Sequence, residues 1–177
     1  MNSNDCVLGT AQSDHKAIRM ATLADLDALV SLEQACFAVP WSRKSFEAEL
    51  HGNAFSKILI IPATPGEQLE IPLLAFICVW VIFEEIRFLN LAVHPQFRGQ
   101  GLARQLILQA LCLGNAQGCR RGMLEVRDSN VAARKLYECF NFKEYGQRKS
   151  YYTNPSEDAI LMMLEPIFNP FSENKYP

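Results

Sequence analysis

The sequence predicts a mixed α/β fold: a sheet of about seven strands with an antiparallel N-terminal half, a βαβα C-terminal half and helices on both faces. Strand-like apolar runs come first, a glycine turn then opens into an amphipathic helix over 97–111, and further strands and a helix follow. A chain of 177 residues, 49% hydrophobic, suits one well-buried core. We therefore expect a single domain over 16–166, a loose leader over 1–15 and a loose tail over 167–177.

The first third of the chain predicts one strand and two helices. Residues 16–22 alternate like a strand, and 22–37 carry apolar side chains at helical spacing, with Thr22 or Asp25 as the cap. Pro40 and Trp41 end that helix, and a second begins at Ser42. The two helices and the VPWS turn between them should form one unit.

The middle of the chain predicts an antiparallel meander of three strands, at 56–61, 72–83 and 86–93. A Pro/Gly loop separates the first two strands, and a turn at Glu84–Glu85 separates the last two. The run 72–83 is shorter than the roughly 20 residues of a membrane helix, and its β-branched and aromatic content favours a buried strand. We therefore expect no membrane association.

The second half predicts alternating strands and helices. The helix after the glycine turn should end near 114–118, and a buried strand at 122–127 and a helix capped by Ser129 or Asn130 follow. This order implies a right-handed parallel crossover. Two antiparallel strands, at 143–152 and 158–166, should close the sheet.

Composition excludes several classes of function. A net charge of −2 and a pI near 5.9 give no broad basic surface for nucleic acid, although the arginines can still meet a small anion. The cysteines form no C-x-x-C pair, so we expect reduced thiols and no metal site in a cytoplasmic protein. The oligomeric state stays open, with a monomer slightly favoured. The cysteines are Cys6, Cys36, Cys78, Cys112, Cys119 and Cys139, and the arginines are Arg98, Arg104, Arg120 and Arg121.

The glycine turn is a candidate anion site. Gly99 and Gly101 remove the Cβ atoms that would keep a ligand from the backbone, and the free N–H groups and positive dipole end of a helix can receive a phosphate. The alternative is an ordinary tight connection between a strand and a helix.

Several separated motifs carry a family resemblance. The block LAVHPQFRGQGLARQLI places Arg98, Gly101 and Ala103 in an R/Q-x-x-G-x-G/A pattern, which resembles the acetyl-CoA signature of the GNAT N-acetyltransferase superfamily. The stretch LEVRDSNVAARKLYECFNF resembles the next strand and helix of the branch that acetylates protein N-termini. With VPWS and QRKSYY…EDAILM, the resemblance covers roughly 16–165 and is closest to members that modify the N-terminal alanine of ribosomal proteins.

The resemblance implies an acetyl-CoA-dependent Nα-acetyltransferase that works by direct attack of the amine on the thioester, without a covalent enzyme intermediate. The strand before the turn would hold the thioester and the pantetheine arm, and the turn would hold the pyrophosphate. The implied cofactor-binding residues are Leu91, Ala92, Val93, Arg98, Gly99, Gln100, Gly101, Leu102, Ala103, Arg104 and Asn130.

The resemblance also implies catalytic residues. Glu125 would be the base that takes a proton from the amine, and Tyr137 would protonate the departing thiolate. Alternatively, Glu125 faces solvent or pairs with Arg127, and Tyr137 packs on the core. Asn130 can both cap its helix and bind the cofactor arm. Asn141 stands where the family usually has glycine, a position in which Asn tolerates a left-handed backbone.

By analogy, Pro40, Trp41, Tyr151 and Tyr152 would wall a groove for the substrate N-terminus, although the tyrosines can equally pack within the sheet. Two acidic residues, Glu33 and Glu84, are available to attract a cationic substrate. For each we favour the simpler assignment, a solvated helix face for Glu33 and a hairpin turn for Glu84. The V-H-P turn predicts a surface position for His94.

Three other functions remain open. A GNAT enzyme for lysine or a small amine would keep the same cofactor motif. A non-catalytic acyl-CoA-binding module is the second alternative, although plausible residues at positions 125 and 137 argue against it. A dinucleotide-binding domain is the third, but the turn lacks the G-x-G-x-x-G pattern and no acidic ribose ligand follows it.

Overall fold

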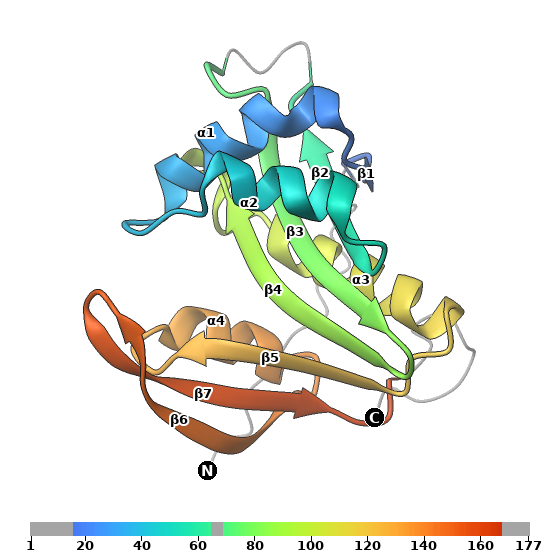
Figure 1. The fold of residues 1–177 in the computed structure, drawn as a ribbon, viewed down its shortest axis with the longest axis vertical. Helices are drawn as coiled ribbons and strands as arrows, with labels where there is room; N and C mark the ends of the chain where they lie inside the picture. The colour runs from blue at the N-terminus through green and yellow to red at the C-terminus, as the bar shows by residue number, and fades with distance from the viewer. Residues whose placement is uncertain (1–15, 65–68, 168–177) are drawn as a thin grey trace.

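The computed structural model describes residues 16–64 and 69–167, which form a seven-stranded sheet with helices on both faces (Figure 1). The strands are β1 (Arg19–Met20), β2 (Ser56–Pro62), β3 (Leu73–Ile82), β4 (Glu85–Val93), β5 (Arg121–Arg127), β6 (Lys143–Thr153) and β7 (Ser156–Leu164). The helices are α1 (Leu26–Cys36), α2 (Arg43–Glu47), α3 (Leu102–Ala116) and α4 (Val131–Glu138), with short turns at Leu23–Asp25, Ala48–Gly52 and Pro95–Phe97.

The sheet has the order β1-β2-β3-β4-β5-β7-β6 within the described residues. Strands β1 to β4 are antiparallel neighbours, β4 and β5 are parallel, and β5, β7 and β6 are again antiparallel. The predicted fold class is therefore confirmed, including the antiparallel first half and the parallel connection through α3.

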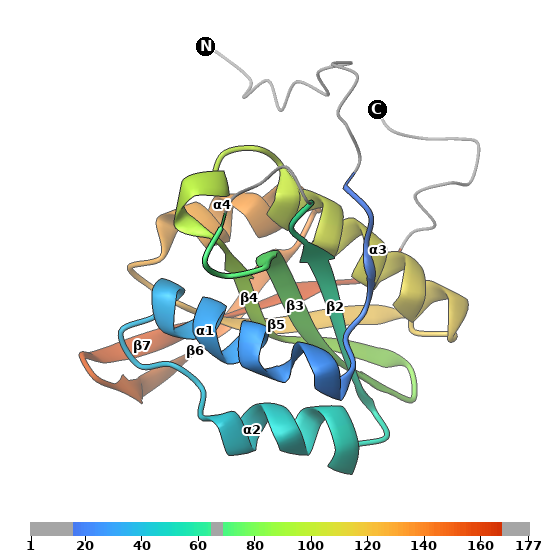
Figure 2. The ribbon, with the colours of Figure 1, turned by 90° about the horizontal axis from the view of Figure 1, so that it is seen from above.

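Helices cover both faces of the sheet, with α3 and α4 on one side and α1 and α2 on the other (Figure 2). Helix α3 places Leu102, Leu106 and Ala110 on one buried face at four-residue spacing. Strand β3 is buried on both faces, which explains its unbroken apolar run. Among the described residues, no helix has the length and apolar character needed to cross a membrane.

The described residues end at Ile167, one residue past the predicted domain boundary at 166. Ile167 is buried, and its N–H donates to the carbonyl of Arg120 at 2.8 Å. Strand β7 also begins at Ser156, two residues before the predicted start. The predicted leader, 1–15, and the tail from 168 onward lie outside the described residues.

A β-bulge in β4 shapes the centre of the sheet. Phe88 pairs with Val79 and Asn90 pairs with Cys78, so Leu89 is an extra residue in β4. The extra residue turns both Leu89 and Asn90 towards α1. Beyond the bulge β4 parts from β5, as Figure 1 shows. The last paired residues of these two strands are Phe88 and Leu124.

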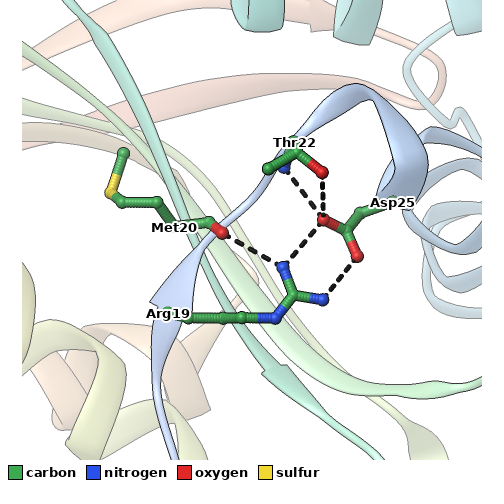
Figure 3. A network of polar contacts seen from close by, with 4 residues as sticks. All are labelled: Arg19, Met20, Thr22 and Asp25. Atoms are coloured by element: carbon green, nitrogen blue, oxygen red, sulfur yellow. Dashed lines mark hydrogen bonds and ion pairs between the residues drawn. The ribbon is translucent and has the colours of Figure 1, made fainter.

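A polar network fixes the entry into α1 (Figure 3). The guanidinium of Arg19 donates two hydrogen bonds to the carboxylate of Asp25, at 2.7 and 2.8 Å. The backbone N–H of Thr22 donates to the same carboxylate at 2.9 Å, as in a helix cap. The bonds from Arg19 lower the pKa of Asp25 from its ordinary 3.8 to about 2.

Replacing Asp25 with Asn is expected to lower the free energy of unfolding by about 1 kcal/mol at pH 7, after allowance for solvent screening. Because the folded state depresses the pKa of Asp25 to about 2, its contribution is present above pH 4 and is lost as the pH falls towards 2. Denaturant unfolding of both proteins between pH 7 and 3 measures this difference. A difference in the free energy of unfolding that stays constant over this range contradicts the assignment of the pKa shift to the Arg19–Asp25 pair. Arg19→Met and the double variant with Asp25→Asn complete a double-mutant cycle for this pair.

Candidate active site

A cavity of about 620 Å³ lies where β4 and β5 part. Pro40 and Trp41 line it from the α1–α2 face, and Asn130 and Tyr137 line it from the α4 face, so it passes through the plane of the sheet. Of the predicted site residues, the cavity brings together Pro40, Trp41, Leu91, Glu125, Asn130, Tyr137, Tyr151 and Tyr152. Those outside its lining are Ala92, Val93, Arg98, Gly99, Gln100, Gly101, Leu102, Ala103 and Arg104.

The edge of β4 presents unpaired backbone groups to this gap. The N–H of His94 donates to the carbonyl of Leu74 on β3, and backbone groups alternate in direction along an antiparallel strand. Ala92 therefore faces β3, whereas Leu91 and Val93 face away from it, towards the gap. The backbone groups of Leu91 and Val93 therefore face the gap and those of Ala92 do not, and the cofactor contacts of all three residues stay predictions.

The carbonyl of Val93 is already engaged. The Arg98 guanidinium donates to it through Nε at 3.2 Å, and the Cys36 thiol donates to it at 3.3 Å. These two bonds join the end of β4 to the glycine turn and to the last residue of α1. The N–H of Val93 and both backbone groups of Leu91 are thus the groups that a ligand can pair with.

The glycine turn has the backbone that an anion site needs. Gly99 and Gly101 have φ angles of 76° and 80°, in the left-handed region that other residues rarely adopt. Within the described residues, the N–H groups from Gly99 to Arg104 donate to no backbone carbonyl. The Arg104 guanidinium lies 5.4 Å from the centre of the Phe140 ring. The turn therefore offers a row of free donors at the start of α3.

Glu125 lies in the middle of β5, between Leu124 and Val126, which point into the core. Its Oε1 atom is 2.7 Å from the guanidinium of Arg148 on β6. The alternative pairing with Arg127 is wrong, because Arg127 pairs with Glu157 instead. Glu125 therefore points to the α1–α2 side of the opening, and its hydrogen bond to Tyr151 is the main cause that raises the pKa of that phenol.

Tyr137 reaches the same opening from the α4 side. Its ring packs against Phe88 and Phe142, with ring centres 6.2 and 5.6 Å apart. Burial raises the pKa of Tyr137 far above its ordinary value, and nearby Tyr152 adds to this effect. The phenol therefore keeps its proton at neutral pH.

Two asparagines behave as the sequence predicts. Asn130 caps α4, because its Oδ1 accepts a hydrogen bond from the N–H of Ala133 at 3.1 Å, and it also lines the cavity. Asn141 has a φ angle of 65°, so asparagine takes the left-handed position usually held by glycine.

Arg127 holds the hairpin between β6 and β7, a role that the sequence did not indicate. Its guanidinium donates to the carbonyl of Asn154 at 3.1 Å, pairs with Glu157 at 3.1 Å and lies 4.1 Å from the centre of the Tyr152 ring. Tyr151 packs edge-on against Tyr152, with ring centres 5.2 Å apart. These contacts fix the positions of Tyr151 and Tyr152, which form one wall of the cavity.

Glu33 corrects a prediction: it is not on a solvated helix face but is 1% exposed. Its carboxylate accepts hydrogen bonds from the backbone N–H of Trp41 at 2.9 Å and from the Asn90 amide at 3.0 Å. Burial raises the pKa of Glu33, and these two bonds act against that effect. The signal in the sequence is the spacing of four residues from Leu29, which places Glu33 on the apolar face of α1.

The two remaining polar candidates, Glu84 and His94, lie outside the lining of the cavity. Glu84 is at the β3–β4 turn, as predicted, and pairs with Arg120 at 3.3 Å. The His94 ring accepts a hydrogen bond from the N–H of Gln96 at 3.3 Å and so caps a short helical turn. Among the described residues, no group of His, Cys, Asp and Glu side chains has the arrangement of a metal site.

Comparison with known proteins agrees with this geometry. Residues 26–142 match the model of the acetyltransferase (GNAT) family. The chain belongs to this family. The resemblance predicted from the sequence is thereby confirmed, and the match spans the strand, glycine turn and helix described above.

Curated relatives narrow the similarity within the GNAT family. The [ribosomal protein bS18]-alanine N-acetyltransferase of Escherichia coli K12 is 36% identical over 142 residues, which are 79% of this chain and 90% of the relative. The enzyme of the same name from Salmonella typhimurium LT2 is 35% identical over 149 residues, 83% of this chain and 95% of the relative.

Solved structures share the fold. The ribosomal-protein-S18-alanine N-acetyltransferase from Escherichia coli aligns with a TM-score of 0.75 at 31% identity, covering 91% of this chain and 99% of that one. Arabidopsis thaliana NAA60 in complex with acetyl-CoA aligns with a TM-score of 0.75 at 17% identity, over 84% of this chain and 97% of that one.

Replacing Glu33 with Ala is expected to lower the free energy of unfolding by about 2 kcal/mol or more, because the Trp41 N–H and the Asn90 amide lose their acceptor in a buried site. Glu33→Gln keeps one acceptor oxygen and should cost about half as much. Denaturant unfolding at pH 7 compares the two. Equal, small losses in both variants contradict a bridging role for this carboxylate.

Proposed function

We propose that this chain is an acetyl-CoA-dependent N-terminal acetyltransferase that modifies the N-terminal alanine of a ribosomal protein. The observation that carries the proposal is the opening between β4 and β5, where Glu125 on the α1–α2 side and Tyr137 on the α4 side line one cavity. The names of the bacterial relatives support the same substrate.

The cofactor would lie along the end of β4 and the glycine turn. The backbone groups of Leu91 can pair with the pantetheine arm much as an added strand would. The free N–H groups from Gly99 to Arg104 can bind the pyrophosphate, because they point from a helix start that carries partial positive charge. Acetyl-CoA supplies the activated acetyl group.

The substrate amine would approach from the α1–α2 side. Only the free amine has the lone pair that attacks a thioester, and an α-amino group has a reference pKa of about 7.7–8.0. Glu125 accepts the proton, directly or through a water molecule, and Arg148 and Tyr151 hold its carboxylate in place. A lysine ammonium, with a reference pKa near 10.4, is much harder to deprotonate, which favours a protein N-terminus.

The CoA sulfur would leave on the opposite side, next to Tyr137. Since burial raises the pKa of this phenol, Tyr137 supports the departing sulfur mainly as a hydrogen-bond donor. The two groups thus act from opposite sides of the sheet, and neither needs a covalent enzyme intermediate.

The direct test is incubation of the protein with acetyl-CoA and peptides that begin with Ala, Ser, Met or Gly. A peptide with a blocked N-terminus and an internal lysine serves as the control, and mass spectrometry locates the acetyl group. The proposal expects acetyl transfer to the α-amine, fastest for Ala. Labelling of lysine alone identifies the chain as a lysine acetyltransferase instead, and CoA binding without any transfer identifies a binding module.

Replacing Tyr137 with Phe should lower kcat by about tenfold to a hundredfold while leaving CoA affinity nearly unchanged, because only the hydroxyl that supports the sulfur is lost. Steady-state kinetics and CoA titration measure the two effects. Unchanged turnover assigns the proton or hydrogen bond to another group, and an equal loss of affinity identifies Tyr137 as a packing residue.

Replacing Gly101 with Glu should abolish CoA binding, since a carboxylate at the turn repels the pyrophosphate. An added Cβ meets no atom within 4 Å, so the fold should survive despite the φ angle of 80°. Gly101→Asn is the matched control, because Asn tolerates this backbone and adds no charge. Calorimetric titration with CoA should separate the two variants. Near-normal affinity in Gly101→Glu removes the pyrophosphate assignment.

A further inference from the structure

A second cavity, of about 490 Å³, lies next to Glu125 on the α1–α2 face of the sheet. It shares Glu125, Trp41 and Tyr151 with the cavity between β4 and β5, so the two cavities are adjacent. Its walls come from the VPWS turn, β3, β4, β5 and β6. Its aromatic lining on this face consists of Trp41, Trp80, Tyr145, Tyr151 and Tyr152, whereas the Phe88 ring packs on the opposite face.

The aromatic walls of the second cavity are held in place by their neighbours. The indole N–H of Trp80 donates to Glu49 Oε2 at 2.7 Å. The Trp41 ring lies 5.5 Å from Phe46, ring centre to ring centre, and its backbone is bonded to Glu33. The cavity is therefore formed in the free protein, which lowers the entropy cost of filling it.

The charges around the second cavity disfavour a cationic occupant. The lining carries two guanidinium groups, Arg87 and Arg148, against one carboxylate, Glu125, so its net positive charge disfavours lysine or arginine. Both are already paired, Arg87 with Glu85 at 2.9 Å and Arg148 with Glu125 at 2.7 Å, so an acidic occupant would have to compete with these carboxylates.

An aromatic side chain is the occupant that the arginine and aromatic lining of the second cavity favours. Guanidinium planes and aromatic rings both stack on an incoming ring. The Arg148 guanidinium already lies 5.5 Å from the centre of the Tyr151 ring, so this surface uses such packing in the free protein.

We propose that the second cavity is a specificity subsite that binds an aromatic side chain near the N-terminus of the substrate. The inference rests on the proposed function, because it places the reacting amine at Glu125. An extended chain advances about 3.3–3.6 Å per residue, so a cavity that begins at Glu125 is within reach of the second to fourth residue. The subsite would select substrates by a residue that is not itself acetylated.

The test uses peptides that begin with Ala and carry a single Phe, Ala, Lys or Asp at position 2, 3 or 4 of an otherwise constant sequence. At one of these positions, Phe should raise kcat/KM about tenfold or more over Ala, with Lys and Asp no better than Ala. A preference for Lys or Asp, or no preference at any position, overturns the subsite while leaving N-terminal acetylation intact. Failure to acetylate any N-terminus contradicts the proposed function itself.

A variant of Tyr145 tests whether the preference for Phe in the peptide arises at the second cavity. Tyr145 is 47% exposed, and Tyr145→Ala should bring the Phe to Ala ratio of kcat/KM close to one. Phe55→Ala is the matched control, because Phe55 is 49% exposed and lines neither cavity. An unchanged ratio in Tyr145→Ala, or an equal loss in Phe55→Ala, contradicts the assignment to this cavity.

Discussion

The parting of β4 from β5 beyond Phe88 and Leu124 is the constraint on which the site depends. Continuous pairing of the two strands would consume the backbone groups of Leu91 and close the cavity. The bulge at Leu89 bends β4 away, and the rings of Phe88, Tyr137 and Phe142 pack together on the α4 side of the sheet. An opening through the sheet lets two substrates meet from opposite faces, one beside each catalytic candidate.

Polar contacts between distant parts of the chain fix the walls of this opening. Glu33 joins the Asn90 side chain on β4 to the backbone of Trp41, and Arg127 joins β5 to the hairpin that carries Tyr152. Burying the Glu33 carboxylate has a free-energy cost that its hydrogen bonds offset, so the contact sets the geometry of the wall and is costly to break. The wall positions therefore depend on side chains that need not touch substrate.

The sequence predicts the elements well because their signals are local. The apolar period of α1 and α3, the alternation in β5, and the glycines at positive φ each depend on a few adjacent residues. The missed features join distant parts of the chain: Glu33 meets Asn90, Arg127 meets Asn154, and Arg148 meets Glu125. Helical spacing puts Glu33 on a buried face, but no local sequence pattern identifies Asn90 as its partner. The family resemblance supplies candidate roles, whereas the geometry shows that Ala92 faces β3 rather than the gap.

The central claim is that the parted strands hold the acetyl thioester between Glu125 and Tyr137. A crystal structure of the protein with acetyl-CoA tests it most directly. The account predicts the pantetheine arm paired with the backbone of Leu91, the thioester in the cavity within reach of both side chains, and the phosphates at the N–H groups of Gly99 to Arg104. A cofactor bound elsewhere, or strands β4 and β5 paired continuously so that no gap remains between them, would contradict the account.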